Sequence, residues 1–177
     1  MRRLLALVYF IAATATAAAL PAQAKELRVP KDGKPALLVD LPTGWHTKTD
    51  RNGGMLLIPP ATSQHAMLYL GVLVDDSMRG AALGTVAAAV GKTVGIERFD
   101  KEEPARVSDA KGGLHRGTAF YGKVPEKRGF SRKAKIVIIP LAPGAWAQAW
   151  TVTQPGMNSV EYDRLDAVLN SITVAGE

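Results

Sequence analysis

Histidine is the first residue type to consider for chemistry, because it binds metals and transfers protons near neutral pH. The 177-residue chain has three histidines and no cysteine, so thiolate metal sites and thiol nucleophiles are excluded. His46, His65 and His115 are not spaced as a metal-binding pair such as His-x-x-x-His, and a zinc site needs three or four converging ligands. We therefore interpret them as exposed histidines, and we expect no metal or other cofactor.

Serine and acidic residues give no stronger signal for catalysis. The sequence has no Gly-x-Ser-x-Gly motif, P-loop or EF-hand pattern. Asp75 and Asp76 are adjacent, so on a strand they would point to opposite faces, and a strand end with a helix cap explains them better. We predict a non-enzymatic protein. The alternative hypothesis is a metal-binding protein or a hydrolase that uses His46, His65 and nearby carboxylates.

Trp45 and His46 follow a turn at Gly44, in the stretch LPTGWH. We interpret Trp45 as a structural anchor after this turn. A shallow groove beside Trp45, His46 and the loop of His65 is our second choice for a binding site.

The first choice is a basic stretch, KVPEKRGFSRKAK, at residues 123–135. Its six cations, which face one acid at Glu126, are Lys123, Lys127, Arg128, Arg132, Lys133 and Lys135. It lies between two predicted strands and should form a protruding hairpin. One interpretation is a solvated edge, because lysines discourage edge-to-edge pairing. The functional interpretation is contact with an anionic partner, either an envelope component or an acidic protein patch. The candidate contact residues are Lys127, Arg128, Phe130, Arg132 and Lys133.

The first half of the chain contains strand signals followed by a helix signal. Strands are predicted at residues 36–39, 54–58 and 66–74, and Asn52-Gly53 indicates a hairpin between the first two. Apolar residues at helical spacing predict a helix from residue 77 to about 95, capped by Asp76 or Ser77. A second stripe on that helix consists of small residues, which we attribute to close approach of the helix to a sheet.

The second half opens with a predicted polar connector at residues 98–113. Three strands follow at about 113–124, 131–141 and 144–153, with turns short enough for antiparallel pairing. Trp146 and Trp150 share one strand face, which we expect to pack against the terminal helix. That helix begins near a capping box formed by Asn158 and Glu161. Two helices and a mostly antiparallel sheet predict a single-domain α/β/α sandwich.

The N-terminal residues 1–24 are predicted to be a secretory signal peptide. Arg2 and Arg3 precede an uncharged segment, and Ala22-Gln23-Ala24 supplies the small-x-small pattern for cleavage after Ala24. Residues 25–177 then form the mature domain, without a predicted transmembrane segment. The net charge of +6 includes Arg2 and Arg3, so the mature domain is only mildly basic, which argues against a nucleic-acid binder.

Several stretches resemble the PsbP-like superfamily: VDLPTGWHTK, GMLLIPP, GVLVDDSM, and the C-terminal AWAQAWTVTQPGMNSVEYDRLDAVLNSI. The resemblance spans nearly the whole mature chain. Within the superfamily, the chain is similar to exported bacterial proteins of the DcrB type. It implies an α/β/α sandwich with a non-catalytic, accessory or assembly role, and it transfers no functional residue. We therefore expect a soluble, monomeric protein, periplasmic or secreted, that binds a protein or an anionic envelope component.

Overall fold

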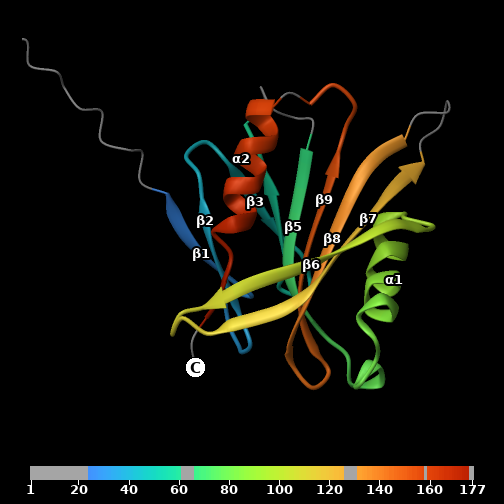
Figure 1. Ribbon diagram of the computed structural model, residues 1–177. Coiled ribbons are helices and arrows are strands. Elements are labelled where there is room, and N and C mark those ends of the chain that lie inside the picture. Colours follow the sequence, from blue (N-terminus) through green and yellow to red (C-terminus); the bar gives the residue numbers. More distant parts are fainter. Residues whose placement is uncertain (1–23, 61–65, 126–130, 158, 176–177) are drawn as a thin grey trace, which may run out of the picture.

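One sheet dominates the computed structural model, which describes residues 24–60, 66–125, 131–157 and 159–175 (Figure 1). Within these residues the sheet has ten strands in the order β1-β2-β10-β6-β7-β8-β9-β5-β4-β3. Neighbouring strands are antiparallel except for the parallel pair β10 and β6. The strands are β1 (Lys25–Val29), β2 (Leu37–Leu41), β3 (His46–Thr49), β4 (Met55–Ile58), β5 (Ala66–Val74), β6 (Phe99–Asp109), β7 (Leu114–Pro125), β8 (Ser131–Ala142), β9 (Ala145–Thr153) and β10 (Thr173–Val174).

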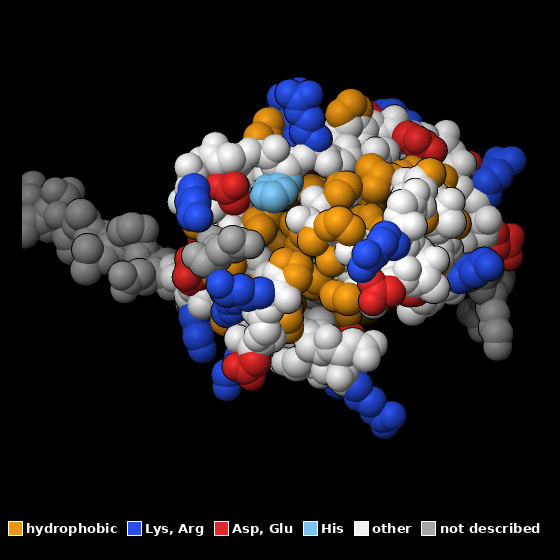
Figure 2. Space-filling model, turned by 90° about the horizontal axis from the view of Figure 1, so that it is seen from below, with side chains coloured by type: hydrophobic (Ala, Val, Ile, Leu, Met, Phe, Trp, Pro, Cys, Tyr) orange, Lys and Arg blue, Asp and Glu red, His pale blue; other side chains and the backbone are white. Residues whose placement is uncertain are grey.

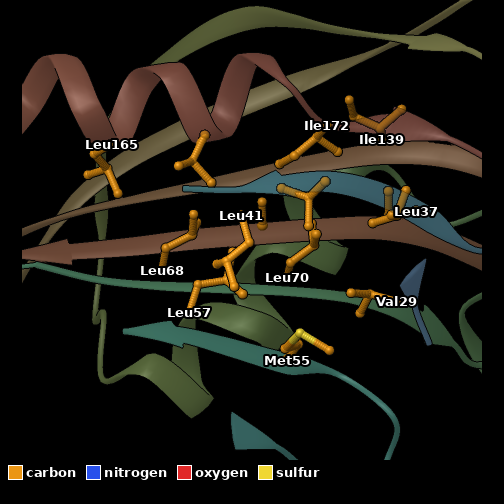
Figure 3. Packing of buried hydrophobic residues seen from close by; sticks show 14 of the residues in the cluster. Val29, Leu37, Leu41, Met55, Leu57, Leu68, Leu70, Ile139, Leu165 and Ile172 are labelled. Atoms are coloured by element: carbon orange, nitrogen blue, oxygen red, sulfur yellow. The ribbon is translucent and has the colours of Figure 1, made fainter. Parts of the chain in front are cut away.

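The helices α1 (Leu83–Val94) and α2 (Ser159–Asn170) cover different faces of this sheet. Ile138 of β8 belongs to the same hydrophobic cluster as Val86 of α1. The next residue, Ile139, belongs to the cluster that contains Leu165 of α2. Because successive side chains on a strand point to opposite faces, the sheet has an α1 face and an α2 face. In Figure 3 Leu165 and Ile172 lie over Leu68 and Leu70 on the α2 face.

The mostly antiparallel sheet in one domain confirms the coarse prediction. The sheet curls into a half-barrel (Figure 1), and in this it differs from the layered α/β/α sandwich that the sequence predicted. Right-handed strand twist accumulates across many paired strands and bends a wide sheet in this way. No helix in the described parts of the chain is long and apolar enough to cross a bilayer.

The predicted connector at residues 98–113 is wrong, since most of it forms the strand β6. Glu103, Ala105 and Val107 are half-buried, whereas the alternate residues Pro104 and Arg106 are exposed. This is a strand period, but charged and small side chains hide it from a search for apolar runs. β7 pairs with β6 along its length and β10 reaches only its last two residues, so Pro104 lies where one edge is unpaired. Proline and charged residues are typical of such edges.

The first helix begins later than predicted. Residues Asp76–Met78 form a separate 3-10 turn, capped by Asp75, whose Oδ1 accepts from the Ser77 backbone N at 2.9 Å. Gly80 then adopts a positive φ of 79°, which an α-helix does not accommodate. The helix starts at Leu83 and ends at Gly95, also with positive φ. A Cβ on Gly91 would lie 3.1 Å from Phe99, so part of the small-residue stripe permits close packing, as predicted.

The remaining predicted elements are found with small shifts in their ends, and three short strands, β1, β3 and β10, were not predicted. The Asn52-Gly53 turn joins β3 to β4, whereas the strand predicted at residues 36–39 is β2, which pairs with β1 and β10. Asn158, half of the predicted capping box, lies outside the described residues, as does the whole predicted signal peptide except Ala24.

The packing of α2 gives a stability prediction. Leu165 is 4% exposed and Val160, on the same helix, is 55% exposed. We expect Leu165→Ala to lower the free energy of unfolding by about 2–5 kcal/mol, because it leaves a cavity beneath α2. Val160→Ala should change it by no more than about 0.5 kcal/mol. Urea unfolding measures both, and equal effects would show that α2 does not pack as described.

Candidate functional site

A groove lies on the α2 face between α2 and the strands β6 to β9. Its volume is about 290 Å³. Its floor is built from one row of directly opposed residues: Glu103 pairs with Ala119, Ala119 with Val137, and Val137 with Ala149. The small alanine side chains leave space that larger residues would fill. From the other side, Leu169 and Ile172 close the groove with apolar surface.

One end of the groove is polar. In the next cross-strand row, Tyr121 lies directly between Lys101 of β6 and Lys135 of β8. Both ammonium groups lie over the Tyr121 ring, 5.6 and 5.7 Å from its centroid. The Tyr121 hydroxyl donates to Glu103 Oε2 at 2.6 Å, and Lys101 forms an ion pair with the same carboxylate. Tyr121 is therefore held in one orientation by a hydrogen bond and two cation–π contacts.

The ionisation of this end is fixed at neutral pH. Burial raises the pKa of Tyr121 to about 12, and the hydrogen bond and negative charge of Glu103 add to the shift. The pKa of Glu103 is lowered, mainly by the side-chain hydrogen bond from Lys101 and next by the one from Tyr121. Because its pKa is raised in the folded protein, protonated Tyr121 stabilises the folded state. This stabilisation is fully present below pH 10.0, the ordinary pKa of tyrosine, and is lost as the pH rises through about 12. A neutral phenol and an ionised carboxylate are suited to binding and orientation rather than to proton transfer near pH 7.

Two further lysines extend this surface along the strands. Lys123 and Lys133 are exposed and directly opposite each other, near the end of the β7–β8 pair. They lie two residues from Tyr121 and Lys135, so they share the α2 face. We call Lys101, Lys123, Lys133 and Lys135 the lysine cluster.

The structure divides the predicted contact residues of the basic hairpin. Lys127, Arg128 and Phe130 lie outside the described residues. Lys133 is exposed on the α2 face. Arg132 is half-buried and pairs with Val124, whose side chain packs in the α1 cluster, so Arg132 faces the other side of the sheet.

The second-choice groove is only a small hollow in its described part, beside Trp45. Trp45 is half-buried and packs against the cluster beneath α2, as the anchor interpretation predicted. The hollow beside Trp45, Met157 and Leu165 has a volume of about 10 Å³, which is room for roughly one water. His46 is exposed on β3, and His65 lies outside the described residues.

His115, the other histidine in the described residues, is far from His46 in the sheet. His115 is on β7, and four strands separate β7 from β3. His115 Nε2 is 3.7 Å from Asp109 Oδ2, but the Asp109 carboxylate also accepts from the backbone N of Lys111 and of Gly113, each at 2.8 Å. Asp109 therefore closes the β6–β7 turn. In the described residues no three potential metal-ligating side chains come together.

The predicted packing of the two tryptophans against the terminal helix is wrong. Trp146 is buried in the cluster with Val86 of α1, and Trp150 packs at its edge, because even-numbered residues of β9 face α1. Trp150 stacks on Tyr69 with ring centroids 5.1 Å apart. The Tyr69 hydroxyl donates to Asp50 Oδ2 at 2.7 Å, and burial together with Asp50 raises the pKa of Tyr69.

This aromatic pair depends on glycines. A Cβ on Gly54 would lie 1.8 Å from the Tyr69 hydroxyl, and one on Gly71 would lie 3.1 Å from the ring. The Asn-Gly-Gly turn therefore provides the surface on which Tyr69 lies, as well as the hairpin that the sequence predicted.

A view from below shows a wider apolar region (Figure 2). Hydrophobic side chains gather in the middle of this face, and charged side chains surround them. A hollow of about 490 Å³ lies where β7 begins and where β8 and β10 end. Its lining includes His115, Leu141 and Val174.

The key residues of the groove were not predicted from the sequence. Glu103 belonged to the predicted connector, and Tyr121, Ala119 and Ala149 carried no motif. The one available signal was the alternation of Lys133 and Lys135 on a predicted strand, which places two cations on one face.

Comparison with known proteins concerns the fold. No protein-family model matches the chain, and no curated protein matches its sequence. The solution structure of cyanobacterial PsbP from Synechocystis is similar, with a TM-score of 0.56 and 13% identity over 89% of this chain and 95% of that one. A crystal structure from Bacteroides thetaiotaomicron gives a TM-score of 0.47 and 12% identity over 80% of this chain, which spans only 46% of that protein.

The polar end of the groove gives a titration prediction. In Glu103→Gln we expect the Tyr121 pKa to fall from about 12 but to stay above 10, because the charge is removed while burial remains the largest cause. NMR titration of ¹³C-labelled tyrosine measures the midpoint.

Lys48→Gln, a change of an exposed lysine on β3, is the matched control and should leave the Tyr121 midpoint unchanged. An unchanged midpoint in Glu103→Gln would rule out the contact between Glu103 and Tyr121.

Proposed function

We propose that this protein, which has a PsbP-like fold, is an exported accessory or assembly protein of the DcrB type. It acts without catalysis, as a monomer in the periplasm or outside the cell, after cleavage following Ala24. It binds an anionic partner, a protein or an envelope component, through the basic hairpin at residues 123–135. The observation that carries the proposal is the exposed pair of Lys123 and Lys133, directly opposite each other on neighbouring strands.

Like charges at opposed positions of an antiparallel pair destabilise it. Lys123 and Lys133 therefore do not serve the stability of the hairpin. Lys135 and Lys101 continue the positive surface along the same face. Several cations on one surface attract an anionic partner over about 8–10 Å at physiological salt and accelerate its association.

The position of the hairpin makes this surface available. β7 and β8 remain paired as far as Pro125 and Ser131, and in Figure 1 these strand ends extend past α1, away from α2. The other predicted contact residues, Lys127, Arg128 and Phe130, lie in the sequence between these strands and outside the described residues. The other interpretation is that the hairpin is a solvated edge that binds no partner. The charge-reversal experiment below distinguishes the two interpretations.

Charge reversal tests the proposal. A photo-crosslinking residue at Ser131 should capture a specific partner in the cell envelope, and Lys123→Glu with Lys133→Glu should reduce the captured amount at least tenfold. The loss follows from repulsion of an anionic surface, so added salt should weaken capture by the unmodified protein as well. Mass spectrometry of the crosslinked product measures both effects.

Lys48→Glu with Lys92→Glu is the matched control, because it reverses two exposed lysines on β3 and α1. Capture should survive in this variant. Capture that is equally strong in the hairpin variant and insensitive to salt would leave the hairpin as a solvated edge.

A further inference from the structure

The groove beneath α2 has the features of a small-molecule site, and it meets the basic stretch at residues 123–135 in Lys135. Apolar residues form most of its floor, a polar cluster lies at one end around Tyr121, and Arg106 and Asn170 also line it. Small-molecule sites combine an apolar surface with a few placed polar groups in this way. We propose that the groove binds an unbranched aliphatic carboxylate, with the chain on the apolar floor and the carboxylate at Lys135.

The apolar part sets the shape of the ligand. The floor is apolar across three strands: Ala119 of β7, Val137 and Ile139 of β8, and Ala147 and Ala149 of β9. Leu169 and Ile172 form the opposite wall. The groove volume of about 290 Å³ is that of a small-molecule site. A single alkyl chain of medium length fits this space.

Lys135 sets the charge of the ligand. Lys101 already forms an ion pair with Glu103, but among the described residues no carboxylate lies within ion-pair distance of Lys135. Lys135 lines the groove, and its ammonium group is held over the Tyr121 ring. The remaining hydrogen-bonding capacity of this ammonium is available to an anion that enters along the floor.

Nearby acids limit the charge that the site accepts. Glu103 lines the same end of the groove, and Asp166 of α2 is close enough for its charge to raise the pKa of Tyr121. Two carboxylates beside one available lysine oppose a dianion. The site therefore fits a carboxylate better than a phosphate monoester. This inference needs only Lys135 of the basic stretch at residues 123–135, since Lys123 and Lys133, which carry the proposed function, do not line the groove.

Octanoate is the probe, because it joins one alkyl chain of medium length to a single carboxylate. Titration into the ¹⁵N-labelled protein should give saturable shifts for amides of β7, β8 and the end of α2. Hexanoate should bind about fifteenfold more weakly, at about fourfold per CH₂ group. Octanol and octyl phosphate should each bind at least tenfold more weakly than octanoate.

Two variants locate the site. Lys135→Met should weaken octanoate binding at least tenfold, because it keeps a similar apolar stem and removes the charge. Lys133→Met, on the same strand and face, is the matched control and should change the affinity less than twofold. Ala149→Leu fills the floor and should abolish binding, with thermal unfolding used to check that the fold is retained.

Several results would overturn the proposal. Equal affinities of Lys135→Met and the unmodified protein would exclude the carboxylate contact. Octanol binding as tightly as octanoate would exclude a role for charge, and tighter binding of octyl phosphate would exclude the restriction to monoanions. Shifts that do not saturate, or that map to the hairpin ends alone, would exclude the groove. By contrast, intact octanoate binding in Lys123→Glu with Lys133→Glu, whether or not crosslinking is lost, would support a groove site that stands apart from the proposed partner surface.

Discussion

The alternation of side chains along β7, β8 and β9 is the constraint on which the structure depends. Each of these strands is covered on both faces, so neighbouring residues belong to different clusters, as Ile138 and Ile139 do. A shift of one residue in the pairing would exchange the two sets of side chains. Both helices, the groove and the lysine cluster therefore depend on a single register.

The two faces use this register differently. On the α1 face, large residues such as Phe120, Trp146 and Ile136 fill the space beneath the helix. On the α2 face, β7 and β9 present alanines, and β8 presents Val137 and Ile139, beside a row that contains Tyr121 and Lys135. The small side chains of the alanines leave a recess beneath α2. Charged groups lie at one end of this recess.

The sequence was sufficient for the elements whose side chains are apolar. The strand at residues 66–74 was predicted to its ends, and the three later strands were found because apolar runs and short turns mark them. β6 was missed because its inward residues are Glu103, Ala105 and Val107, a pattern in which only the period and not the hydrophobicity indicates a strand. The tryptophans could be assigned to one face of β9 but not to a particular helix, because periodicity does not say which helix covers that face. The groove was not predictable for a related reason: an alanine in a strand reveals nothing until the opposite wall is known.

The two residues of β10 connect distant parts of the chain. They pair with β2 on one side and β6 on the other, so the N-terminal β1–β2 hairpin joins the rest of the hydrogen-bonded sheet through Thr173 and Val174. During synthesis on the ribosome, β1 and β2 emerge early and can pair with each other, but the strand that joins them to β6 is made last. Without residues 173 and 174 the β1–β2 hairpin would contact the rest of the fold through side-chain packing and not through strand pairing.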